Sequence, residues 1–154
     1  MKKAILWLTL LALCVPALGG IPRASSFGQE PRSNYVVKDG TAEWVAPAGV
    51  SMDAVWAATL KALMTMRWST DLVEKASWKI AAHQAHGSFT TFGKDEADMP
   101  RVEITLIEGN APTLLVRWYI AGSGLKFGWG HEKKKFYRKF FAALDEALEL
   151  GRTS

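Results

Sequence analysis

The segment RVEITLIEGNAPTLLVRWYIA, residues 101–121, decides the fold because it contains two alternating strands and the turn between them. In each half, an apolar side chain recurs at every second position, which is the period of a strand with one buried face. Gly109-Asn110-Ala111-Pro112 lies between the halves and predicts a turn. The segment therefore predicts an antiparallel hairpin with these inward side chains: Val102, Ile104, Leu106, Leu114, Val116, Trp118 and Ile120.

Two more hairpins are predicted upstream. The first joins residues 35–37 to residues 41–45, because Asp39-Gly40 between apolar runs favours a tight turn. The second joins two short strands through residues 74–77, and its inward side chains are expected to be Trp68, Thr70, Leu72, Trp78, Ile80 and Ala82. Residues 84–100 fit either a short edge strand or an ordered loop.

Two amphipathic helices complete the pattern. Ser51 is a suitable N-cap and Asp53 suits the first turn of a helix whose apolar residues share one face: Met52, Val55, Trp56, Thr59, Leu63 and Met66. A second helix is expected from about Glu132 to Leu150, with Gly151 as its C-cap. This order predicts an α+β fold, a two-layer sandwich in which an antiparallel sheet of hairpins carries two helices packed on one face.

The N-terminus has the composition of a secretory signal peptide. Lys2 and Lys3 precede an apolar run, residues 4–15, that is short for a permanent membrane span. Small residues favour cleavage after Gly19, with Ala17 as the alternative site. We therefore expect a signal peptide at 1–19, a flexible tether at 20–34 and a single α+β domain at 35–154. The domain would be exported across the inner membrane and be periplasmic or secreted, with membrane association left open.

Cys14, the one cysteine of the chain, bears on the same question. An acylated lipoprotein and an uncleaved anchor are alternatives, although Leu13 stands where acylation motifs require a small residue. After cleavage the domain lacks cysteine, which excludes disulfides, thiol catalysis and cysteine-ligated metals. Removing Lys2 and Lys3 also lowers the net charge from +4 to +2, and so mild a charge does not indicate binding to nucleic acid.

Sites for chemistry are weakly indicated. His83 and His86 would need Asp95, Glu96 or Asp98 to complete a zinc site. Residues three apart on an extended strand point to opposite sides, which favours two surface histidines. Neither a nucleophile elbow nor a phosphate loop occurs. We therefore expect no catalytic residue, no metal, no cofactor and no enzymatic activity.

The tryptophans fall mostly on the inward phase of their predicted elements, so core packing is their expected role. The alternative is an apolar cleft between the sheet and the last helix, with Trp56, Trp118 and Phe140 as candidate lining residues. Such a cleft would make the domain a carrier of a small apolar or lipid ligand.

Positive charge is concentrated near the start of the last helix, at Lys126, Lys133, Lys134, Lys135, Arg138 and Lys139. Cations there oppose the helix dipole, and cations four residues apart repel each other. Tyr137 and Phe141 widen the apolar arc toward Lys134, so we expect partly exposed aromatic rings beside the cations. This face is either a solvated surface or a binding site for an anionic membrane.

The segment SMDAVWAATLKAL, residues 51–63, and the elements around it resemble small bacterial envelope proteins and lipoproteins of unknown function. The layout of about residues 41–150 is also similar to the helix-grip domains of BamC-like lipoproteins of the outer-membrane assembly machinery. The resemblance implies an envelope role without catalysis and carries over no functional residue. We therefore expect a binding or adaptor domain for another envelope component or an anionic membrane surface. A ligand carrier is the alternative, a hydrolase ranks third, and the oligomeric state is not indicated.

Overall fold

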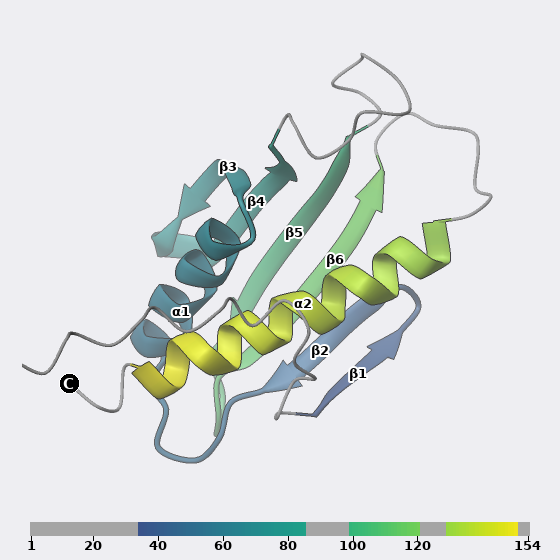
Figure 1. Ribbon diagram of the computed structural model, residues 1–154. Coiled ribbons are helices and arrows are strands. Elements are labelled where there is room, and N and C mark those ends of the chain that lie inside the picture. The colour runs from purple at the N-terminus through teal and green to yellow at the C-terminus, as the bar shows by residue number, and fades with distance from the viewer. Residues whose placement is uncertain (1–33, 86–98, 121–128, 151–154) are drawn as a thin grey trace, which may run out of the picture.

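The computed structural model describes residues 34–85, 99–120 and 129–150. The sheet has six antiparallel strands in the order β1-β2-β6-β5-β4-β3, and both helices lie on one of its faces (Figure 1). This is the predicted two-layer α+β sandwich. Its elements are β1 (Tyr35–Lys38), β2 (Thr41–Val45), α1 (Met52–Thr65), β3 (Trp68–Glu74), the short helix η1 (Lys75–Ser77), β4 (Lys79–Gln84), β5 (Pro100–Ile107), β6 (Thr113–Ile120) and α2 (Trp129–Leu150).

The central hairpin is formed by β5 and β6, as predicted. Its register runs from Pro100 opposite Ile120 to Ile107 opposite Thr113. Because paired residues share a face of the sheet, the inward phases of the two strands coincide. Six of the seven predicted inward side chains are buried against the helices, and Ile120 packs partly buried on the same core.

The hairpin of β1 and β2 turns at Asp39 and Gly40. Both residues have positive φ, 47° and 81°, as a two-residue turn that matches the strand twist requires. Tyr35 of this edge strand stacks on Phe141 of α2, with ring centroids 4.4 Å apart. The edge of the sheet that this hairpin forms therefore packs against one side of α2.

The hairpin of β3 and β4 departs from the predicted alternation. Its register shifts between Thr70 and Leu72, so Asp71 is an extra residue, a β-bulge. Leu72 was expected inward, but the bulge moves it to the side without helices, where it is 48% exposed. Trp78 directly precedes β4 and lies in the turn after η1, where its φ is 53°. The centroid of its ring lies 5.5 Å from that of Trp56.

Helix α1 begins at the predicted cap. The Ala54 N–H donates to Ser51 Oγ at 3.2 Å, which satisfies a backbone donor that the first helical turn leaves without an acceptor. The helix ends at Thr65 with Met66 as its C-cap, and the next residue, Arg67, has φ 59°. A non-glycine residue in this left-handed conformation is strained.

We therefore predict that Arg67→Gly raises the free energy of unfolding by about 0.5–1 kcal/mol, because glycine relieves strain that exceeds its extra chain entropy. Trp78→Gly, at a similar φ, should instead destabilise the fold, because the ring packed on Trp56 is lost. Urea denaturation of the two variants provides the comparison. A loss of stability for Arg67→Gly would contradict the strain argument.

Helix α2 begins three residues before its expected start and packs beside α1. Among the helices of the described ranges, none combines the length and the apolar character that a bilayer crossing requires. The predicted signal peptide, tether and Gly151 cap, and the open question at Ser88-Phe89-Thr90-Thr91-Phe92, concern residues outside these ranges.

Candidate functional site

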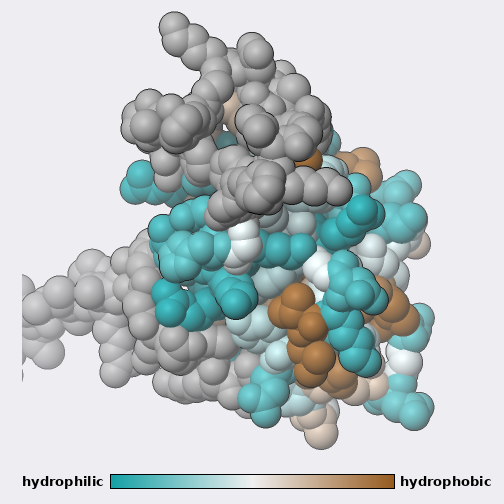
Figure 2. All heavy atoms as spheres, turned by 90° about the vertical axis from the view of Figure 1, so that its right-hand side faces the viewer, coloured by the Kyte–Doolittle hydropathy of each residue, from teal (hydrophilic) through white to brown (hydrophobic). Residues whose placement is uncertain are grey.

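The basic first half of α2 is the surface that the sequence singles out. Lys134, Lys135 and Arg138 are exposed, whereas Lys133 and Lys139 are half-buried. Figure 2 looks toward the end of the molecule at which α2 begins and shows hydrophilic side chains gathered there beside smaller hydrophobic areas. Lys126 lies outside the described residues. We name Lys134, Lys135 and Arg138 the basic face.

Lys133 is held differently from the other cations of α2. A Cβ atom added to Gly40 would lie 2.5 Å from Lys133 Nζ, so the ammonium group lies against the β1–β2 turn. Burial first, and then the nearby charge of Arg117, lower the pKa of Lys133 from its ordinary value. Lys133 is therefore a packing residue of the turn as well as a cation.

Tyr137 and Phe141 are not partly exposed, which corrects the expectation of an uncovered edge on α2. Their exposed fractions are 1% and 0%. The Tyr137 hydroxyl donates to the Gly40 carbonyl at 2.7 Å and accepts the Trp118 N–H at 3.2 Å. The β1–β2 hairpin thus covers the arc that looked open, because the pattern of a single helix does not show which other element lies over its flank.

The charges of α2 follow an order that opposes its dipole. Its lysines and arginines all lie between Lys133 and Lys139, and its second half carries Asp145, Glu146 and Glu149. Glu132 in the first turn has the favourable sign and lies 3.8 Å from Lys135 Nζ. An exposed charge of unfavourable sign costs a helix about 0.3–1 kcal/mol in its first or last turn, and the cost falls off beyond that turn. Because α2 begins at Trp129, the residues from Lys133 to Lys139 lie beyond its first turn, so their order costs the fold little stability.

The candidate cleft residues Trp56, Trp118 and Phe140 are all in the buried core, with exposed fractions of 7%, 6% and 0%. Trp56 packs edge-on against Trp78, and Phe140 packs against Phe136 and Phe141. Core packing, the expected role of these rings, is confirmed.

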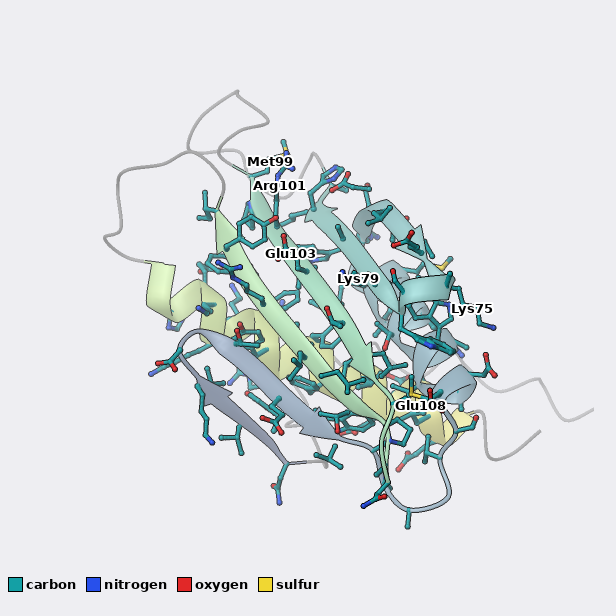
Figure 3. All side chains as sticks on the ribbon, turned by 180° about the vertical axis from the view of Figure 1, so that it is seen from behind. Lys75, Lys79, Met99, Arg101, Glu103 and Glu108 are labelled. Carbon is teal, nitrogen blue, oxygen red and sulfur yellow. The ribbon has the colours of Figure 1, made fainter. Side chains whose placement is uncertain are left out.

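A second polar surface lies on the sheet face away from the helices. Figure 3 views this face and labels Arg101 and Glu103 on β5. The register places His83 opposite Arg101 and Arg101 opposite Tyr119, so one row crosses three strands. We name these residues the open-face cluster: Asp71, His83, Arg101, Glu103, Arg117 and Tyr119.

Most members of the open-face cluster are paired with one another. Asp71 Oδ1 lies 2.6 Å from His83 Nδ1. The Tyr119 hydroxyl donates to Glu103 Oε1 at 3.1 Å, and Arg117 Nη1 lies 3.8 Å from Glu103 Oε2. Burial and the Glu103 carboxylate raise the pKa of Tyr119 from its ordinary value, so its hydroxyl stays protonated and donating.

Arg101 is the exception in the open-face cluster. Its Nε is buried and has no hydrogen-bond acceptor, and no carboxylate of the described residues pairs with its guanidinium group. An unsatisfied donor on a charged group is costly.

Sequence reasoning missed the open-face cluster. The sequence shows Arg101 and Glu103, and likewise Arg117 and Tyr119, at the outward positions of the two alternating strands. The register of the hairpin would have placed these four side chains together. His83 and Asp71 join them only because β4 pairs with β5 and the bulge in β3 turns Asp71 toward the same face. His86, Asp95, Glu96 and Asp98, weighed as zinc ligands with His83, lie outside the described residues.

Comparisons with known proteins add no relative. No protein-family model matches the chain, and no curated protein matches it significantly.

Proposed function

We propose that the chain is an exported, non-enzymatic binding domain of the cell envelope that docks on an anionic membrane surface through the basic face of α2. The observation that carries the proposal is the exposure of Lys134, Lys135 and Arg138 on a helix whose charge order opposes its own dipole. Surface lysines and arginines each contribute about 1 kcal/mol to binding at an anionic membrane. These exposed cations thus have a binding role.

The structure bears on how such docking would work. Tyr137 and Phe141 are buried, so no aromatic ring of this pair inserts into the membrane. The acidic second half of α2 would be repelled by the same surface, which favours contact through the N-terminal end of the helix rather than along its length. Binding would therefore be electrostatic and strongly reduced by salt.

We predict that the exported protein co-sediments with vesicles that contain phosphatidylglycerol at low salt and much less at physiological salt. Replacing Lys134, Lys135 and Arg138 by glutamine should weaken binding more than a hundredfold, since three contributions of about 1 kcal/mol are removed. Intact mass spectrometry of the same preparation would establish where the exported chain begins and whether Cys14 remains.

A matched control variant replaces Lys61, Lys75 and Lys79, which are exposed elsewhere on the domain, by glutamine. It has the same net charge as the basic-face variant and should bind nearly as well as the wild type. Equal sedimentation of both variants would show that only net charge matters. If neither the wild type nor the control variant sediments with the vesicles, membrane docking is refuted. Capture of a protein partner through the same three residues, in the absence of vesicles, would favour the adaptor alternative.

A further inference from the structure

The two edge strands of the sheet are protected to different degrees. On β3, a bulge at Asp71 interrupts the ladder, and the exposed acids Asp71 and Glu74 discourage another strand from pairing there. On β1, at the other edge (Figure 1), the register with β2 is unbroken, and Val36 and Val37 are 57% and 48% exposed. An apolar edge strand without a bulge is open to pairing with a further strand.

Val37 supplies backbone groups for such pairing. The hairpin turns through two residues, Asp39 and Gly40, so Lys38 and Thr41 form the hydrogen-bonded pair that closes it. Hydrogen-bonded and non-hydrogen-bonded pairs alternate along an antiparallel ladder, so the Val37 N–H and C=O point away from β2. A further strand alongside β1 would bond to both groups.

The side of α2 next to this edge carries charges in an order that fits a second copy of the chain. Phe141 of α2 stacks on Tyr35 of β1, so this stripe of the helix faces the edge. Spacings of four and seven residues place four charged residues on the same stripe: Lys134, Arg138, Asp145 and Glu149. The two cations precede Phe141 and the two anions follow it at similar distances along the helix. A two-fold axis beside Phe141 therefore brings the basic half of each helix toward the acidic half of the other.

We infer that two copies of the chain form a two-fold symmetric dimer, in which the β1 strands pair antiparallel and the α2 helices lie antiparallel on the same side of the joined sheets. A two-fold interface brings one patch of the surface onto itself. Both features meet this condition, because Val36 and Val37 meet the same valines and the charge order of α2 is complementary to itself. The dimer goes beyond membrane docking and would compete with it, since both use Lys134 and Arg138.

The test is sedimentation equilibrium of the exported protein, without vesicles, from micromolar to millimolar concentration. The wild type should reach the mass of a dimer within this range, and a wild type that stays monomeric throughout would overturn the inference. Val37→Pro should weaken dimerisation about tenfold or more, because two backbone N–H donors are lost, one from each copy. Dimerisation of Val37→Pro as strong as that of the wild type would overturn the pairing of β1.

Two charge variants test the arrangement of the helices. Lys134→Glu with Arg138→Glu makes the stripe acidic, and Asp145→Lys with Glu149→Lys makes it basic. Each variant alone should dimerise about tenfold more weakly than the wild type or worse, because like charges then meet across the axis. An equimolar mixture of the two should form a heterodimer, because opposite charges meet in both halves of the interface. A mixture that stays monomeric would overturn the antiparallel arrangement.

A matched control, Lys61→Glu with Lys79→Glu, makes the same change of net charge at exposed positions away from α2 and should dimerise like the wild type. A control that dimerises as weakly as the stripe variants would overturn the role of the stripe. The wild-type measurement needs no substitution, so the inference remains testable if a variant does not fold. Because vesicles are absent, a failure of the dimer leaves membrane docking standing.

Discussion

Trp118→Ala is expected to lower the free energy of unfolding by about 3–5 kcal/mol, which is a large part of the stability of a small domain. Trp118 is 6% exposed on β6, near the middle of the sheet, and its ring belongs to the buried core. Removing it takes apolar surface out of the core and leaves a cavity that the rigid sheet cannot close. Chemical denaturation of the wild type and the variant measures the difference.

Ile107→Ala is the control for this prediction. Ile107 lies on the neighbouring strand β5 but is 44% exposed on the opposite face, so its removal should change stability by about 1 kcal/mol or less. Similar losses for the two variants would mean that the helix-covered face is not the main core. Near-wild-type stability of Trp118→Ala would contradict the packing described for this ring.

Tyr137→Phe should lower the free energy of unfolding by about 1–3 kcal/mol, although it removes a single oxygen atom. The substitution removes the hydroxyl that bonds both the Trp118 N–H and the Gly40 carbonyl. These two groups follow directly after Arg117 and Thr41, the last pair between β6 and β2. The Tyr137 hydroxyl therefore connects the β1–β2 turn to β6 where the two strands no longer pair directly. Tyr119→Phe is a matched control, because within the described ranges that hydroxyl bonds to the exposed Glu103 alone, and it should change stability by about 0.5 kcal/mol or less.

The same substitution predicts a pH dependence. Burial raises the pKa of the Tyr137 hydroxyl above its ordinary value of 10.0. As pH rises past that value, the unfolded chain releases this proton before the folded chain does, so the folded state is destabilised relative to the unfolded state. The stability difference between wild type and Tyr137→Phe should therefore narrow above about pH 10. A widening gap would show that the shift has the opposite sign.

Residue alternation was sufficient to predict the central hairpin, because one buried face imposes a period of two on both strands. The turn at Asp39-Gly40 and the cap at Ser51 were also predictable, since each depends on the chemistry of one or two residues. These features are local, and the structure confirms them.

The errors involved contacts that are distant in sequence. Leu72 was placed in the core because a bulge at Asp71 leaves no clear mark in a short alternating run. Tyr137 and Phe141 were expected at the surface because the hairpin that covers them is distant from α2 in the sequence. Gly40, which accepts the hydrogen bond of Tyr137, lies 97 residues before it. The open-face cluster was missed for the same reason, since its row depends on the order of the strands in the sheet.

The proposed docking is tested most directly by determining which face of the protein contacts a bound vesicle. In a chain carrying Cys14→Ser, an environment-sensitive fluorophore is attached to either His131→Cys, exposed in the first turn of α2, or Ile107→Cys on the open face. With vesicles containing phosphatidylglycerol, we predict a blue shift for the label at 131 that physiological salt reverses, and no shift for the label at 107. A shift at 107 without one at 131 would contradict docking through the basic face.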